Sequence, residues 1–118
     1  MALYDAHEAV VWWSSRVEIA SALARLLRMQ QLNTIDYTKA LKLAQDLADS
    51  WSEIQPSDAI RTRASLLVQS YDLRASDSLQ LAAALEWCQD VPSGRLLLTA
   101  DQRLREAALL SGFDAKPL

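Results

Sequence analysis

The sequence predicts an α/β protein in which strands separated by helices form a parallel sheet. Two short apolar runs, AVVWW at 9–13 and RLLLT at 95–99, are too short for helices and are typical of buried strands. The longer stretches between and after them are rich in Ala and Leu, which favour helices. Strands that alternate with helices are joined by right-handed crossovers, so the helices cover the faces of a parallel sheet.

Length and composition limit the class of protein. The chain has 118 residues, 51% of them hydrophobic, and only two Gly and three Pro, which fits one domain over 1–118 and excludes a disordered or collagen-like chain. A single cysteine excludes an intrachain disulfide and favours a reducing compartment. No apolar run is long enough to span a membrane, and the beginning lacks the pattern of a signal peptide. We expect a cytoplasmic protein with no membrane partner.

The first half of the chain predicts one strand and two helices. The strand at 9–13 precedes a helix at about 16–30, in which Arg25 and Arg28 suit the helix dipole near its end. A second helix spans about 36–51, where apolar residues at spacings of three and four form one stripe.

The second half predicts two strands, three helices and an optional edge strand. A short strand within SEIQP ends at Pro56, and Ser57 begins the next helix. The segment 77–88 predicts a helix that is buried almost all round. After the strand at 95–99, a helix ends at Gly112, and FDAKP can add an edge strand.

Several common catalytic arrangements are absent from the sequence. The single histidine, His7, lies in a polar stretch, so neither a Ser-His-Asp triad nor a His-rich metal site has support. Cys88 lies within an apolar helix and is interpreted as an inert buried thiol. Both glycines are isolated near the C-terminus, which excludes a glycine-rich phosphate loop.

Three carboxylates remain, each at the opening of a predicted helix. Glu18 follows the first strand, Asp101 follows the strand at 95–99, and Asp77 opens the buried helix. Ligands of open α/β sheets bind outside the carboxyl ends of the strands, where such residues converge. Three carboxylates there would repel one another unless a cation lay between them, and Mg²⁺ or Mn²⁺ prefers such oxygen ligands.

The same acids are also typical helix caps. Ser15 and Glu18 form an S-x-x-E capping box, in which the Glu side chain returns to a backbone N–H. Asp77 and Asp101 can likewise be cap or first-turn residues that favour the helix dipole. Spacing alone leaves the metal cluster and the structural interpretation open.

Three segments of the chain resemble a known family. SSRVEIASALAR, LRASDSLQLAAAL and LLLTADQRLREAALLSGF, in this order, are similar to segments of the PIN domain, and most similar to VapC-type toxins of bacterial toxin–antitoxin pairs. The resemblance covers about 9–115. The positions that match L-x-A-x-D-x-x-x-L-A-x-A are Leu73, Ala75, Asp77, Leu81, Ala82 and Ala84. Those that match T-x-D-x-x-L-x-x-A-A-x-x-x-G are Thr99, Asp101, Leu104, Ala107, Ala108 and Gly112.

The resemblance implies a PIN-like three-layer fold, with a short twisted parallel sheet flanked by helices. It also implies hydrolysis of RNA phosphodiesters with Mg²⁺ or Mn²⁺. Carried over by position, Glu18, Asp77 and Asp101 would be the catalytic metal ligands, and Thr99 a supporting hydroxyl. Similar proteins form homodimers and bind a cognate antitoxin in the acidic groove, so both partners are expected here.

The beginning of the chain departs from the family pattern. Members normally begin with a central strand that carries an Asp ligand, but no such segment precedes AVVWW, and no strand-like run precedes Asp5. We therefore expect the first strand to be missing, with an incomplete acidic site and an edge or gap in the sheet that another chain could cover. Two explanations stay open: an N-terminal truncation of an ordinary nuclease, or a degenerate PIN protein.

Three functions are consistent with these observations. The first is a metal-dependent endoribonuclease, in which the carboxylates hold the metal that activates water. The second is an inactive PIN-fold module that binds RNA or an antitoxin, which the missing Asp favours. The third is an α/β scaffold in which all three acids are caps.

Overall fold

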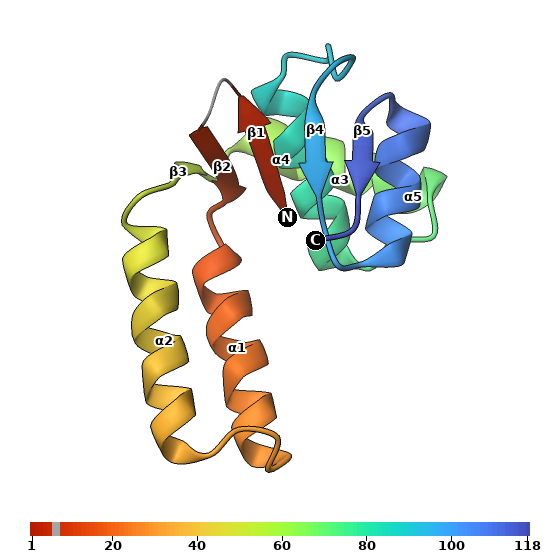
Figure 1. Ribbon diagram of the computed structural model, residues 1–118. Helices are drawn as coiled ribbons and strands as arrows, with labels where there is room; N and C mark the ends of the chain where they lie inside the picture. Colours follow the sequence, from red (N-terminus) through yellow and green to blue (C-terminus); the bar gives the residue numbers. More distant parts are fainter. Residues whose placement is uncertain (6–7) are drawn as a thin grey trace. The chain divides into compact units, whose positions relative to one another are not determined.

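The computed structural model describes residues 1–5 and 8–118, and His7 lies outside them. The described chain forms two compact units. Met1–Trp12 and Ser52–Leu118 form the sheet unit, and Trp13–Trp51 form the helical unit. Figure 1 shows the helices and strands of both units with their labels.

The sheet unit contains a mixed sheet of five strands in the order β3-β2-β1-β4-β5 (Figure 1). The strands are β1 (Ala2–Asp5), β2 (Glu8–Trp12), β3 (Ser52–Ile54), β4 (Leu96–Leu98) and β5 (Asp114–Lys116). β2 pairs with β3 and β4 pairs with β5 in parallel, whereas β1 is antiparallel to both of its neighbours. Four strands therefore run in one direction, and the central strand runs in the other.

The central strand corrects the predictions of a wholly parallel sheet and of a missing first strand. Leu3 is fully buried and is paired in register with Val10 of β2 and Leu97 of β4, both buried, whereas Tyr4 is exposed. β1 ends at Asp5 and β2 begins at Glu8, and so short a connection joins only antiparallel strands. The centre of the sheet is filled, and the expected gap is not present there.

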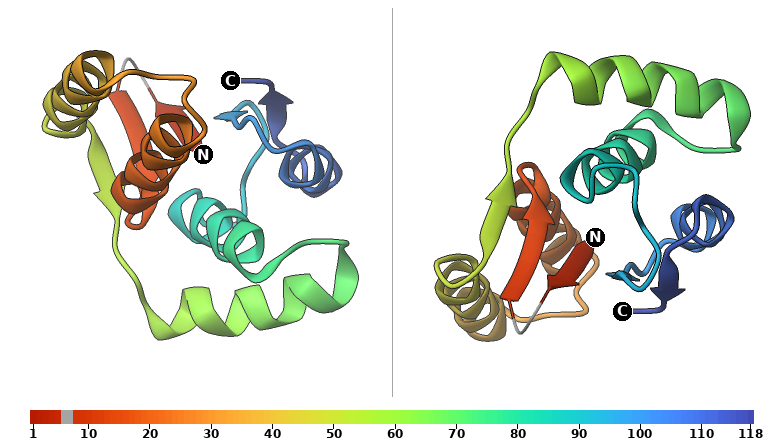
Figure 2. Two further views of the ribbon diagram at one scale, coloured as in Figure 1. Left: turned by 90° about the horizontal axis from the view of Figure 1, so that it is seen from below. Right: turned by 90° about the horizontal axis from the view of Figure 1, so that it is seen from above.

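Helix α4 (Ala75–Trp87) is the core helix of the sheet unit, and its predicted burial on almost all sides is confirmed. One side joins Leu81 and Ala84 to the cluster of Leu3 and Leu97, and another joins Ala82 to a second core cluster. Figure 2 shows α4 between α3 (Asp58–Ser70) and the strands of this unit. Small side chains on α4 permit this close packing on several sides.

Helix α5 (Gln102–Ser111) follows β4 and connects it to β5. Its end was predicted correctly, because Gly112 is the C-cap residue with a left-handed φ of 109°. A Cβ at this position would lie 3.0 Å from Pro92 Cγ, so a larger residue would be strained in two ways. The edge strand predicted within FDAKP is also confirmed as β5.

The helical unit consists of α1 (Ser15–Arg28) and α2 (Thr34–Ala48). The helices predicted at 16–30 and 36–51 are both found. α1 ends two residues before its predicted end, and α2 ends three residues before its predicted end. The Asn33 side chain accepts a hydrogen bond of 2.7 Å from the Asp36 N–H, which fixes the start of α2. No helix in the described ranges is long and apolar enough to cross a membrane.

Candidate functional site

Asp77 and Asp101 line one polar pocket of the sheet unit, with a volume of about 490 Å³. The pocket is formed where the chain leaves β4 for α5 and where α4 begins, which is the strand-end position that the sequence predicted. Its lining residues are Asp72, Arg74, Asp77, Asp101, Gln102, Arg103 and Glu106. Four carboxylates and two guanidinium groups give the pocket a formal charge of −2.

Asp101 has a defined structural role as the N-cap of α5. Its Oδ1 accepts a hydrogen bond of 2.8 Å from the Leu104 N–H. The Asp101 N–H in turn donates to Thr99 Oγ1 at 3.1 Å, and Thr99 is buried. The Thr99 hydroxyl therefore holds the turn that places Asp101 at the pocket. The capping hydrogen bond uses only one acceptor site of the carboxylate, so the other acceptor sites of Asp101 are left for a cation.

Asp77 is the most buried carboxylate of the pocket, with 7% of its surface exposed. It lies in the first turn of α4, whose N-cap residue, Arg74, makes no side-chain capping bond. Burial raises the pKa of Asp77 above its ordinary value, and the charge of Asp101 raises it further. The backbone N–H of Arg74 and the charges of Arg74 and Arg103 oppose this rise. A buried carboxylate beside another anion would be stabilised in its charged form by a cation.

Asp77 and Asp101 are the residues of the pocket that could hold a hydrated divalent cation. Mg²⁺ is usually held by one or two carboxylates and keeps several of its waters, so two protein ligands suffice for weak binding. A complete protein cage is not formed, because no group of three or more His, Cys, Asp or Glu in residues 1–5 and 8–118 is arranged to hold a metal ion.

Glu18, the third predicted ligand, belongs to the helical unit. It lies in the first turn of α1 and lines a hollow along that helix, together with Ser21 and Arg25. The predicted capping box is not centred on Ser15, because the helix begins at Ser15 and its N-cap is Ser14. Ser14 makes no capping bond, and Ser15 Oγ is buried without a hydrogen-bond partner in the described part of the chain. The structure thus brings together two of the three predicted acids within one unit.

The arginines of the pocket were not predicted as site residues. Arg74 lies three residues before Asp77, and Arg103 lies two residues after Asp101, so both enter the pocket with the acids. Arg103 Nη1 lies 3.7 Å from Asp72 Oδ1, across an exposed ion pair. Their closeness in sequence to the two acids was a signal that could have identified them.

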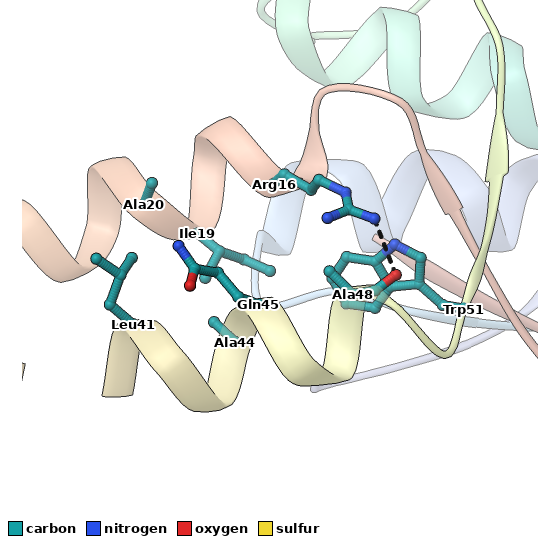
Figure 3. A pocket seen from close by; sticks show the side chains of 8 residues that line it. All are labelled: Arg16, Ile19, Ala20, Leu41, Ala44, Gln45, Ala48 and Trp51. Carbon is teal, nitrogen blue, oxygen red and sulfur yellow. Dashed lines mark hydrogen bonds between the residues drawn. The ribbon is translucent and has the colours of Figure 1, made fainter. Parts of the chain in front are cut away.

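A second cavity, of about 220 Å³, lies within the helical unit between α1 and α2 (Figure 3). It is mostly apolar, and Arg16 closes one end by donating from Nη2 to the Ala48 carbonyl at 3.0 Å. The other lining residues are Ile19, Ala20, Leu41, Ala44, Gln45 and Trp51. It contains no carboxylate, so its chemistry differs from that of the acidic pocket.

Comparison of the chain with protein-family models, with curated proteins and with solved structures finds no match.

Proposed function

We propose that this chain is a PIN-like, metal-dependent endoribonuclease domain. The observation that carries the proposal is the pairing of the buried Asp77 with Asp101 in one polar pocket beyond the end of β4. Both positions also fit the sequence motifs that resemble the PIN domain. The proposed cofactor is Mg²⁺ or Mn²⁺, and the proposed substrate is an RNA phosphodiester.

The charge of the pocket supports a cation-dependent function. With a formal charge of −2, the pocket would repel a phosphodiester until a divalent cation neutralised it. Asp77 and Asp101 would hold the cation, and the turn fixed by Thr99 would keep Asp101 in place. When bound, such a cation lowers the pKa of its water and offsets charge on phosphate oxygens.

Calorimetric titration with Mn²⁺, combined with a cleavage assay on a labelled RNA pool, tests this function. Asp77→Asn should weaken Mn²⁺ binding about tenfold or more and abolish cleavage, since it removes the charge of one of two ligands. Asp58→Asn is the matched control, because Asp58 is also a first-turn acid but is exposed on α3 and outside the pocket. Equal Mn²⁺ binding by both variants would reject the metal site.

A second candidate is a non-cleaving module that binds RNA or an antitoxin. The direction of β1 favours it: Ala2 is paired with Leu98 at the end of β4, and Asp5 is paired with Glu8 at the start of β2. The residues of β1 that are paired with β4, Ala2, Leu3 and Tyr4, carry no carboxylate. RNA binding that depends on divalent cations, without cleavage by the wild-type protein, would select this candidate.

A homodimer and a cognate antitoxin are further proposals that follow from the family resemblance. Light scattering on the purified chain measures its oligomeric state. An antitoxin that occupied the acidic pocket should compete with Mn²⁺, so its binding should weaken as Mn²⁺ is added.

A further inference from the structure

We propose that Arg74 and Arg103 contact RNA phosphates beside the acid pair, and that Asp72 occupies Arg103 until RNA displaces it. This inference rests on the proposed function, because it concerns the way in which the same pocket binds its substrate. It assigns the substrate contacts to two residues and a competing role to a third.

Both arginines are available to a ligand that enters the pocket. Arg74 and Arg103 are exposed, and both line the pocket that contains Asp77 and Asp101. Guanidinium groups bind phosphate oxygens with two parallel N–H donors, a geometry that a lysine cannot supply. The two residues lie at the openings of α4 and α5, on either side of the acid pair in sequence, and bring two cationic groups to the same pocket.

The two arginines differ in their partners. Arg103 faces Asp72 at 3.7 Å, with 54% of the Arg103 side chain and 88% of the Asp72 side chain exposed. This separation is too long for a direct hydrogen bond, and so exposed a pair changes an equilibrium by no more than about fivefold. Asp72 therefore competes weakly for Arg103, and a phosphate with two good acceptors can replace it.

Asp72 also lines the acidic pocket, so its charge opposes an incoming phosphate directly. A displaced Asp72 would turn towards solvent, where its side chain is already largely exposed. In the proposal, the ion pair therefore lowers RNA affinity in the ligand-free protein.

Fluorescence anisotropy with a short fluorescein-labelled oligouridylate tests this assignment, with Ca²⁺ as the divalent cation. Arg103→Gln and Arg74→Gln should each weaken binding about fivefold or more. Each should also reduce the slope of log affinity against log salt by about 0.7, because one phosphate contact is lost. Arg103→Lys should restore the salt slope but only part of the affinity, since it keeps the charge without the bidentate geometry.

Asp72→Asn separates competition at Arg103 from general charge repulsion. The variant should bind the oligouridylate about two- to fivefold more tightly. This gain should persist when Arg74→Gln is added and disappear when Arg103→Gln is added. An equal gain in both backgrounds would show that Asp72 acts only through its charge and would overturn its role as a competitor.

The outcomes distinguish this inference from the proposed function. If RNA binding depends on Asp77 but both arginine variants keep wild-type affinity and salt slope, the phosphate assignment is wrong and the acidic site stands. If no RNA binding depends on Asp77, the proposed function and this inference are both rejected. Circular dichroism of each variant verifies that the fold is intact.

Discussion

Helices α1 and α4 both begin with an acid in their first turn, yet their surroundings differ sharply. Only Ser15 is buried in α1, whereas eight residues of α4 are buried, among them Asp77 and Leu81. Both helices are rich in Ala and Leu, so composition does not explain the difference. α4 packs against α3, α5 and β2, whereas the contacts of α1 within its own unit are with α2. An acid in the first turn of a helix is therefore buried only where the surrounding core encloses it, as at Asp77.

The largest expected difference between the two helices is in the cost of truncating an aliphatic side chain. Leu81→Ala removes a fully buried side chain of α4 and should lower the free energy of unfolding by about 2–5 kcal/mol. Val17→Ala on α1, where Val17 is 70% exposed, should change it by less than about 0.5 kcal/mol. Urea unfolding of both variants measures this. Similar losses in the free energy of unfolding for the two variants would show that Val17 is buried to the same extent as Leu81.

Two buried serines extend the comparison to polar groups. Ser78 Oγ of α4 donates a hydrogen bond of 2.6 Å to the Ala64 carbonyl of α3, while Ser15 Oγ has no partner among the described residues. Ser78→Ala should therefore lower the free energy of unfolding by about 1 kcal/mol. Ser15→Ala should be neutral or stabilising, because it removes an unsatisfied buried hydroxyl. A loss of stability in Ser15→Ala as large as that in Ser78→Ala would contradict this difference.

Local patterns predicted much of the fold of the sheet unit. The apolar run before α5, the burial of α4 on almost all sides and the stop at Gly112 are visible in local sequence patterns, and all three were predicted correctly. β1 was missed because Leu3 is the one buried residue among Ala2–Tyr4, and its burial depends on strands far away in the sequence. Tertiary pairing, which no local pattern encodes, made this segment the central strand.

The candidate site was predictable to the same extent. Asp77 and Asp101 line one pocket beyond the end of β4, where the strand-end rule places ligands, although Asp77 follows α3 instead of a strand and Glu18 belongs to the helical unit. The rule could not show that Asp101 is at once an N-cap, nor that the pocket also contains Arg74 and Arg103. Those features depend on side-chain directions in the first turns of α4 and α5. The roles of Glu18, Asp77 and Asp101 as ligands remain predictions.

Asp101 offers a way to separate capping from cation binding. Asn caps helices as well as Asp does, so Asp101→Asn should change the free energy of unfolding by less than about 0.5 kcal/mol, whereas Asp101→Ala should cost about 1 kcal/mol. Both variants should lose Mn²⁺ affinity, because both remove the carboxylate. Thermal unfolding and Mn²⁺ titration measure the two effects. If Asp101→Asn keeps wild-type Mn²⁺ affinity, the cap is the only role of this residue.

The smallest expected effect is a pH dependence that belongs to Asp77. Its pKa is raised in the folded protein by burial and by Asp101, so the folded state binds its proton more tightly than the unfolded state does. The stability that this proton contributes is fully present below the unfolded pKa and is lost as the pH rises through the raised pKa. Residue 77 cannot titrate in the Asp77→Asn variant, so the stability of the variant relative to wild type should increase over that pH window and then level off.

Urea midpoints of both proteins across acidic pH measure the difference. A difference that stays constant with pH would show that burial of Asp77 does not shift its titration. Saturating Mn²⁺ should reverse this dependence in the wild-type protein, since a bound cation lowers the pKa of Asp77 in the folded state below its unfolded value, and stability then rises with pH.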